Sequence, residues 1–208
     1  MSEGADHRHT HPTQPDLEDQ PFEYYQLMAE AVGELLIEKG VFTAAELRKT
    51  VEQIDARSPA DGARVVARAW VDPAYKERLL EDGNAAAAEI GIDAGAIPIR
   101  VVENTEDVHN VVCCTLCSCY PRLLLGLPPD WYKARAFRSR IVREPRAVLK
   151  EFGTVIPDDV ELCVHDSTAD LRYMVLPRRP EGTETLSEAE LSKLVTRDCM
   201  IGTACVEA

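Results

Sequence analysis

Apolar residues in the first part of the chain recur with the spacing of α-helices. The first predicted helix begins near Phe22 and ends at Gly40, since glycine is a helix stop signal. The next begins at TAAE, where Thr43 is the predicted N-cap and Glu46 completes a capping box, and it runs to about Asp55. One face of the first helix is predicted to carry Met28, Val32, Leu35 and Leu36.

Helical spacing continues as far as residue 92. Residues 60–83 are predicted to be helical with a break at Asp72–Pro73, and Gly83 ends or bends this segment before the alanine-rich stretch at 84–92. These helices bring few apolar residues for a core of their own. We therefore expect residues 21–95 to form a helical arm that packs on a partner subunit.

After Gly95 the apolar spacing changes to that of strands, which are predicted at 97–104, 109–114, 161–166 and 171–177. Proline-initiated helices are predicted between the strand pairs, at 128–142 and 144–153. Near the end, Ser187 and Glu190 form a second capping box. The pattern predicts an α+β protein in which the arm precedes a layered α-β-β-α domain at 96–208. Residues 1–20 are predicted to be a disordered tail containing His7, His9 and His11.

Charge narrows the choice of partners. The 208 residues include 36 acidic and 23 basic side chains, for a net charge of −13, which repels phosphate backbones and anionic lipid. Neither nucleic acid nor a membrane is therefore an expected partner. The arginines between 138 and 146 are expected to face solvent or to pair with acidic neighbours. With no apolar segment of membrane-spanning length and no apolar secretion signal, the expected location is the cytoplasm.

The cysteines are the residues that point to a particular chemistry. The chain has seven, an odd number, and four of them lie in CCTLCSCY at 113–120. Such a cluster does not form a disulfide framework, and it indicates metal or redox chemistry instead. Within it, Cys114, Cys117 and Cys119 form C-x-x-C-x-C directly after a predicted strand.

The one-residue gap between Cys117 and Cys119 would bring their shared backbone close to a bound ion. If the amide nitrogens of Ser118 and Cys119 bind as anions, they can share a plane with the sulfurs of Cys117 and Cys119. The Cys114 sulfur would then lie below that plane, and one position would stay open. Removing an amide proton requires a small, highly charged ion, so low-spin trivalent cobalt or iron fits better than Zn²⁺.

Three other interpretations of the cluster are open. Structural zinc normally has four protein ligands, and no second Cys/His pair stands at the required spacing. An iron–sulfur cluster needs four ligands at other spacings. Ordinary buried or redox-reactive thiols would explain single cysteines but not their close grouping.

Three longer stretches carry a family resemblance: VCCTLCSCYP, LGLPPDWYKARAFRSRIVREPRAVLKEFG, and VHDSTADLRYMVLPRRPEGTETLSEAELSKLVTRDCMIG. Together with their flanks, over residues 24–203, they resemble the metal-binding α subunit of nitrile hydratase. The motif V-C-[TS]-L-C-S-C of that family is among the more specific short metal motifs. The resemblance implies an enzyme that hydrates nitriles to amides.

It further implies a non-corrin metal held by the sulfurs of Cys114, Cys117 and Cys119 and by the amides of Ser118 and Cys119. The implied catalytic residues are Cys119, Cys117 and Ser118, with Cys117 oxidised to sulfinic and Cys119 to sulfenic acid. Thr115 stands where family members with threonine usually hold cobalt, so Co³⁺ is expected and iron less so. A separate β-type subunit would supply arginines to the oxidised sulfurs, and a metallochaperone is a further candidate partner.

Some residues depart from the family pattern. Cys113 replaces a common valine and is expected to be a buried thiol on the opposite face of the strand from Cys114. Arg122 replaces a pocket tryptophan, as in the cobalt subunit of thiocyanate hydrolase, and suits an anion or a polar heteroaromatic nitrile. Tyr120 and Asp166 complete the predicted substrate pocket. The rival functions are thiocyanate hydrolase, which yields carbonyl sulfide and ammonia, and a non-catalytic zinc-binding interaction module.

Overall fold

The computed structural model describes residues 24–207, so the predicted tail at 1–20 lies outside the described residues. The chain divides into two compact units, Met1–Lys49 and Thr50–Ala208. No helix in the described part is both long enough and apolar enough to cross a bilayer.

The first unit contains helix α1 (Tyr24–Glu38) and the start of helix α2 (Ala44–Asp55). As predicted, α1 ends at a glycine, because Gly40 adopts a φ of 68° and its N–H donates to the carbonyl of Ile37. The predicted capping box is confirmed. The N–H of Thr43 donates to Glu46 at 2.7 Å, and the N–H of Glu46 donates to the Thr43 hydroxyl at 3.2 Å. Neither helix buries a residue.

Four strands form two parallel pairs in the second unit, and they confirm the four predicted strand segments. In the first pair Ile99 lies opposite Arg172, and in the second Cys113 lies opposite Asp166. The strands are β1 (Ile99–Glu103) paired with β4 (Arg172–Leu176), and β2 (Val108–Cys113) paired with β3 (Glu161–Asp166).

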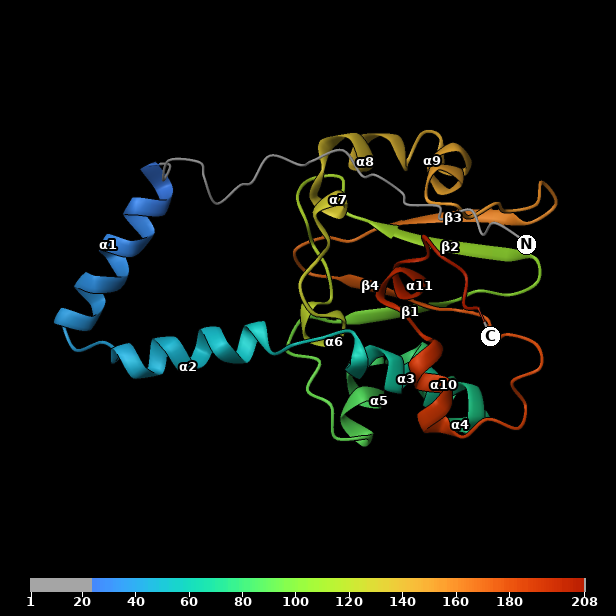
Figure 1. Cartoon of the computed structure of the whole chain (residues 1–208), viewed down its shortest axis with the longest axis horizontal. Helices are drawn as coiled ribbons and strands as arrows, with labels where there is room; N and C mark the ends of the chain where they lie inside the picture. The colour runs from blue at the N-terminus through green and yellow to red at the C-terminus, as the bar shows by residue number, and fades with distance from the viewer. Residues whose placement is uncertain (1–23, 208) are drawn as a thin grey trace, which may run out of the picture. The chain divides into compact units, whose positions relative to one another are not determined.

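Helices lie on both sides of these strands (Figure 1). Four helices lie on the β1 side: α3 (Ala60–Val71), α4 (Pro73–Glu81), α5 (Gly83–Glu89) and α10 (Glu188–Leu194). On the β3 side lie α8 (Arg135–Arg140) and α9 (Pro145–Glu151), preceded by α7 (Asp130–Lys133). The short α6 (Arg122–Leu125) contacts α3, and α11 (Arg197–Ile201) contacts β4 and β2. The predicted α+β class is thus confirmed.

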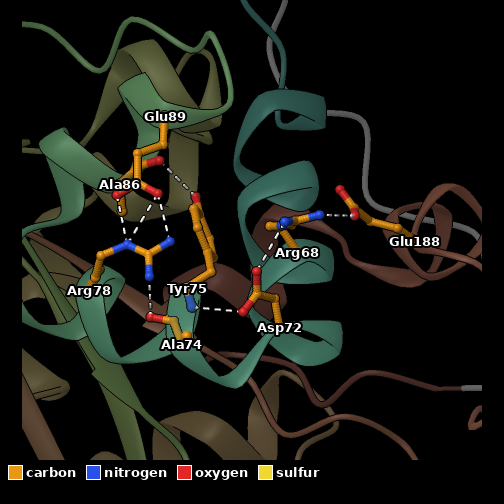
Figure 2. Close-up of polar contacts among 8 residues, drawn as sticks. All are labelled: Arg68, Asp72, Ala74, Tyr75, Arg78, Ala86, Glu89 and Glu188. Atoms are coloured by element: carbon orange, nitrogen blue, oxygen red, sulfur yellow. Dashed lines mark hydrogen bonds and ion pairs between the residues drawn. The ribbon is translucent and has the colours of Figure 1, made fainter.

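A buried tyrosine joins the helices on the β1 side (Figure 2). The Tyr75 hydroxyl donates to the carbonyl of Ala86 at 3.0 Å, and its ring lies between the guanidinium groups of Arg68 and Arg78, 6.0 and 5.9 Å from the ring centroid. Burial raises the pKa of Tyr75 to about 12. Helices α3, α4, α5 and α10 are linked by ion pairs among Arg68, Asp72, Arg78, Glu89 and Glu188.

The predicted break at Asp72–Pro73 is confirmed, with Asp72 capping α4 and Pro73 as its first residue. Gly83 begins α5 after the cap at Asp82, and a Cβ at this glycine would lie 2.6 Å from the carbonyl oxygen of Ile99. Helix α5 can therefore lie directly against β1.

The prediction of one helix over 128–142 was wrong. Ala134 has an extended conformation, with φ −62° and ψ 135°, and it separates α7 from α8. The sequence also did not predict α6 and α11. The predicted arm boundary near residue 95 stays a prediction, and within the second unit α3 and α4 bury Val65, Val66 and Leu79 in the same core as Met174 of β4.

Candidate metal centre

The three cysteines of C-x-x-C-x-C come together in the loop that follows β2. The Sγ atoms of Cys114 and Cys117 are 3.6 Å apart, those of Cys117 and Cys119 are 3.3 Å apart, and all three lie within 4.8 Å of one another. Cys114 is buried, Cys119 is half-buried and Cys117 is exposed. Because Leu116 is also 85% exposed, the sulfur cluster lies at the surface of this chain.

Backbone N–H groups point toward the sulfurs. The N–H of Cys117 donates to the Cys114 sulfur at 3.3 Å. The pKa of the Cys117 thiol is lowered, first by hydrogen bonds from the thiols of Cys119 and Cys114 and then by the N–H groups of Ser118 and Cys119. Burial raises the pKa of the Cys119 thiol to about 12, against the opposing charge of Arg172.

These donors fit the metal set expected from the sequence better than they fit structural zinc. Three sulfurs and the amides of Ser118 and Cys119 occupy one loop. Within the described residues, no fourth His, Cys, Asp or Glu joins the cluster, although structural zinc takes four such ligands. Cys113 contributes nothing to it, because its side chain is fully buried in the core as predicted, and burial raises its pKa to about 12.

Thr115 anchors the first half of the loop. Its N–H and hydroxyl donate to the two carboxylate oxygens of Asp166, at 2.9 and 2.6 Å. Its carbonyl accepts a hydrogen bond from Arg138 of α8 at 3.1 Å. A further Arg138 hydrogen bond, from Nε to the carbonyl of Lys133 at 3.0 Å, holds the guanidinium in place. Residues from β3 and α8 thus fix the turn that begins the cysteine motif.

Tyr132 anchors the other end of the loop. Its ring is fully buried, and its hydroxyl donates to the carbonyl of Cys119 at 2.9 Å. Burial raises its pKa. The ring of Tyr120 meets the Tyr132 ring edge-on, with centroids 5.2 Å apart, and the Tyr120 hydroxyl donates to the carbonyl of Leu125. Tyr120 is therefore a core residue whose hydroxyl does not point to the cysteines.

A cavity of about 310 Å³ adjoins the end of the motif. Two of the three residues predicted for the substrate pocket, Tyr120 and Arg122, line it, whereas Asp166 lies at the start of the motif beside Thr115. Arg172, the first residue of β4, also lines the cavity, and its charge acts on the Cys119 thiol. The structure therefore brings Arg172 to the site, which the sequence pattern did not single out.

Sequence reasoning also missed the roles of Arg138 and Tyr132. The expectation that the basic run faces solvent or pairs with acidic neighbours holds for Arg140, which binds Glu144 and Glu151. It is wrong for Arg138 and Arg146, which donate to backbone carbonyls. A carbonyl partner distant in sequence leaves no mark in the residue pattern, so no signal could have found these contacts.

Comparison with known proteins agrees with the family resemblance that the sequence carries. The profile of the family described as "Nitrile hydratase, alpha chain" matches residues 23–204. The high-molecular weight cobalt-containing nitrile hydratase subunit alpha of Rhodococcus rhodochrous is 50% identical over 182 residues, which are 86% of this chain and 89% of that protein.

Solved structures are similar over most of the chain. A recombinant thiocyanate hydrolase with partially modified cobalt centres superposes with a TM-score of 0.83 at 41% identity, covering 90% of this chain and 92% of the other. A double mutant of the Fe-type nitrile hydratase from Comamonas testosteroni superposes with a TM-score of 0.81 at 43% identity, covering 88% and 91% of the two chains.

Proposed function

The chain belongs to the nitrile hydratase alpha-chain family, and we propose that it is the metal-binding subunit of a cobalt nitrile hydratase, which hydrates a nitrile to its amide. The observation that carries this proposal is the loop of Cys114, Cys117 and Cys119, whose sulfurs lie within 4.8 Å of one another. The relative at 50% identity contains cobalt, and Thr115 stands between the first two cysteines. Cobalt is therefore favoured over the iron of the Comamonas protein.

In this proposal the chain's own residues build a fixed metal pocket. The sulfurs of Cys114, Cys117 and Cys119 and the amides of Ser118 and Cys119 hold the ion, with Cys117 as sulfinate and Cys119 as sulfenate. When bound, trivalent cobalt supplies a Lewis acid that activates nitrile or water. The Cys119 sulfenate oxygen would act either as nucleophile toward the nitrile carbon or as base toward the attacking water.

The anchors of the loop explain why the ligands need not rearrange on binding. Asp166 and Arg138 hold Thr115, and Tyr132 holds the carbonyl of Cys119. With both ends fixed, the sulfurs are already near each other before metal arrives. In this proposal, the contribution of this chain to catalysis is a ligand loop that is held in place before the metal binds.

The exposed part of the loop indicates a partner subunit. Cys117 and Leu116 are open to solvent in this chain, whereas oxidised sulfurs beside a metal need cationic partners and exclusion of water. We propose that a β-type subunit covers the loop and supplies arginines, with a metallochaperone delivering cobalt. The seven cysteines, all free, favour assembly in the reducing cytoplasm.

Arg122 favours a second function, thiocyanate hydrolysis. This guanidinium lines the cavity next to the cysteine loop, and it can bind an anion such as thiocyanate. The solved thiocyanate hydrolase is similar over 90% of this chain.

Co-expression with the subunits encoded by neighbouring genes, in cobalt-supplemented medium, tests the proposal. We expect about one cobalt per assembled pair, amide formation from a panel of nitriles, and mass spectra of peptide 113–122 with two oxygens added to Cys117 and one to Cys119. A Cys114→Ser variant should lose the cobalt and the activity. Turnover of thiocyanate in place of nitriles would establish the second function. A colourless zinc protein, inactive after cobalt loading, would refute both enzymatic interpretations.

A further inference from the structure

The cavity beside the cysteine loop is cationic, although the chain as a whole carries a net charge of −13. Three arginines line its 310 Å³, and no lining residue is acidic. One of the three, Arg57, has Asp61 as a partner at 4.0 Å. The other two, Arg122 and Arg172, form no ion pair with any described carboxylate.

Arg172 is fixed in place but is incompletely bonded. It begins β4 opposite Ile99, and its N–H donates to the carbonyl of Pro98 at 2.9 Å. Its guanidinium nitrogen Nη1 is buried and has no hydrogen-bond partner among the described residues. An unpaired buried donor is costly, and Arg172 is also one of the residues that line the cavity. Arg122 lies at the first residue of α6, exposed, three residues after Cys119.

The rest of the wall suits an apolar body. Gly95 and Ala96 present almost no side chain, and Ile97, Leu123 and Leu127 are apolar. Gly95 has a φ of 82°, and a Cβ there would lie 2.6 Å from Cδ1 of Leu123. Any side chain at this position would therefore strain the backbone and displace Leu123 from the wall.

We propose that this cavity is a subsite for an anionic group on the substrate, and that the preferred nitriles carry a carboxylate on a flat apolar body. The assignment rests on the proposed nitrile hydration. Tyr120 links the cavity to Cys119 along the chain, so the nitrile end would lie toward the cysteine loop and the carboxylate toward Arg122 and Arg172. Guanidinium groups pair with carboxylates through two parallel hydrogen bonds. A three-atom anion such as thiocyanate would leave most of the volume empty.

The test compares 4-cyanobenzoate with its neutral methyl ester on the cobalt-loaded complex. We expect the carboxylate to have the higher kcat/KM. Arg122→Gln should lower kcat/KM for the carboxylate by about tenfold to a hundredfold, mainly through KM, and change the ester less than about threefold. The control Lys150→Gln removes one positive charge from an exposed position on α9 and should leave both substrates unaffected.

Equal effects of Arg122→Gln on both substrates, or a wild-type preference for the ester, would overturn the subsite. If the complex hydrates no nitrile, the proposed function fails, and calorimetry with benzoate and benzamide still tests the cavity. Benzoate binding that is selective over benzamide and is lost in Arg122→Gln would retain the anion subsite without the nitrile chemistry. No benzoate binding to the wild-type complex would refute it.

Discussion

Thr115 is joined to the rest of the protein by three hydrogen bonds, through its N–H, its hydroxyl and its carbonyl. Two of these reach Asp166, 51 positions along the chain, and the third comes from Arg138, 23 positions along. The cysteine motif indicates which side chains we propose as metal ligands. It does not show which residues hold the loop, since these are set by the tertiary fold.

Arg138 is expected to act through Thr115 on metal retention. The Arg138→Gln variant should remain folded yet bind cobalt about tenfold or more weakly, because removal of an outer hydrogen bond loosens the ligand loop. Arg138→Lys should recover part of the affinity, since its ammonium can still donate to the carbonyl of Thr115. Competition with a chelator, followed by cobalt analysis, measures the difference.

Arg135→Gln is the matched control, because Arg135 is an exposed arginine on the same helix. It should retain wild-type cobalt affinity. Equal cobalt affinity in Arg138→Gln and Arg135→Gln would show that the hydrogen bond to Thr115 does not matter for the metal.

His109 is expected to make stability depend on pH. Its Nε2–H donates to the carbonyl of Gly202 at 2.8 Å, and its Nδ1 accepts from the Asn104 amide at 3.3 Å, an arrangement that needs the neutral ring. Burial lowers its pKa below the unfolded value near 6.5. The neutral ring therefore stabilises the fold above about pH 6.5, and this contribution is lost as the pH falls through the folded pKa.

Urea unfolding at pH 7.5 and pH 5.5 measures this effect. The wild-type chain should lose free energy of unfolding at the lower pH, and His109→Gln should lose less. Some loss should remain in the variant, because burial also lowers the pKa of His165. An identical loss in both proteins would exclude His109 as a source.

At the scale of elements, the end of α11 meets β2 at Gly202. This glycine has a φ of 90°, and a Cβ on it would collide with the carbonyl oxygen of Asn110 and lie 2.9 Å from Cα of Val111. The helix can lie against the strand only because the side chain is absent.

Gly202→Ala should therefore cost about 3 kcal/mol or more, from backbone strain together with displacement of β2. Gly182→Ala is the matched control, because Gly182 has a φ of 77° and a Cβ added to it would have no neighbour within 4 Å. The Gly182→Ala substitution should lower the free energy of unfolding by about 1 kcal/mol, from backbone strain alone. Urea unfolding curves measure the free energy of unfolding of both variants. An equal loss in the two would mean that β2 moves away from the new side chain without loss of stability.

Local signals in the sequence predicted most elements of the second unit. Short runs of residues that favour strands marked all four strands, and Ser187 with Glu190 marked the start of α10. The helices that the sequence did not predict are short. Helices α6 and α11 have four and five residues, too few for helical spacing to appear. The parallel pairing of β2 with β3 was not predicted, because strand partners across about fifty residues depend on packing.

In the site, too, the local sequence sets some features and the tertiary fold sets others. The three sulfurs come together as their spacing indicated, because a turn of a few residues is set locally. Arg172 and Tyr132 reach the site from β4 and α7, and that placement comes from the topology of the whole unit.

At the scale of the whole molecule, the first unit carries apolar side chains that the described residues of this unit do not bury. In α1, Leu27, Met28, Val32 and Leu35 are all more than 40% exposed, and neither α1 nor α2 buries a residue. Exposed apolar residues on one helix are typical of a surface that another chain covers. This supports the predicted role of the arm in binding a partner subunit.

The Met28→Glu/Leu35→Glu double variant should weaken association with the β-type subunit about tenfold or more, because it places two charges on one helix face. Titration of the partner, followed by light scattering or ultracentrifugation, measures this. Glu30→Lys, on the opposite face of the helix, changes the net charge by the same magnitude and should have little effect. Unchanged assembly of the double variant would show that this face is not the interface.

Because Cys113 is aligned with Asp166 where β2 and β3 end together, the pairing also aligns the start of the metal loop with the carboxylate that holds it. A slip of one residue in β3 would turn Asp166 to the other face of the sheet. Inserting or deleting a single residue in β3 should therefore weaken metal binding as the mutation of a proposed ligand would, although all the proposed ligands would still be present. Indels there, rather than substitutions, are the changes that protein engineers working on this scaffold should avoid first.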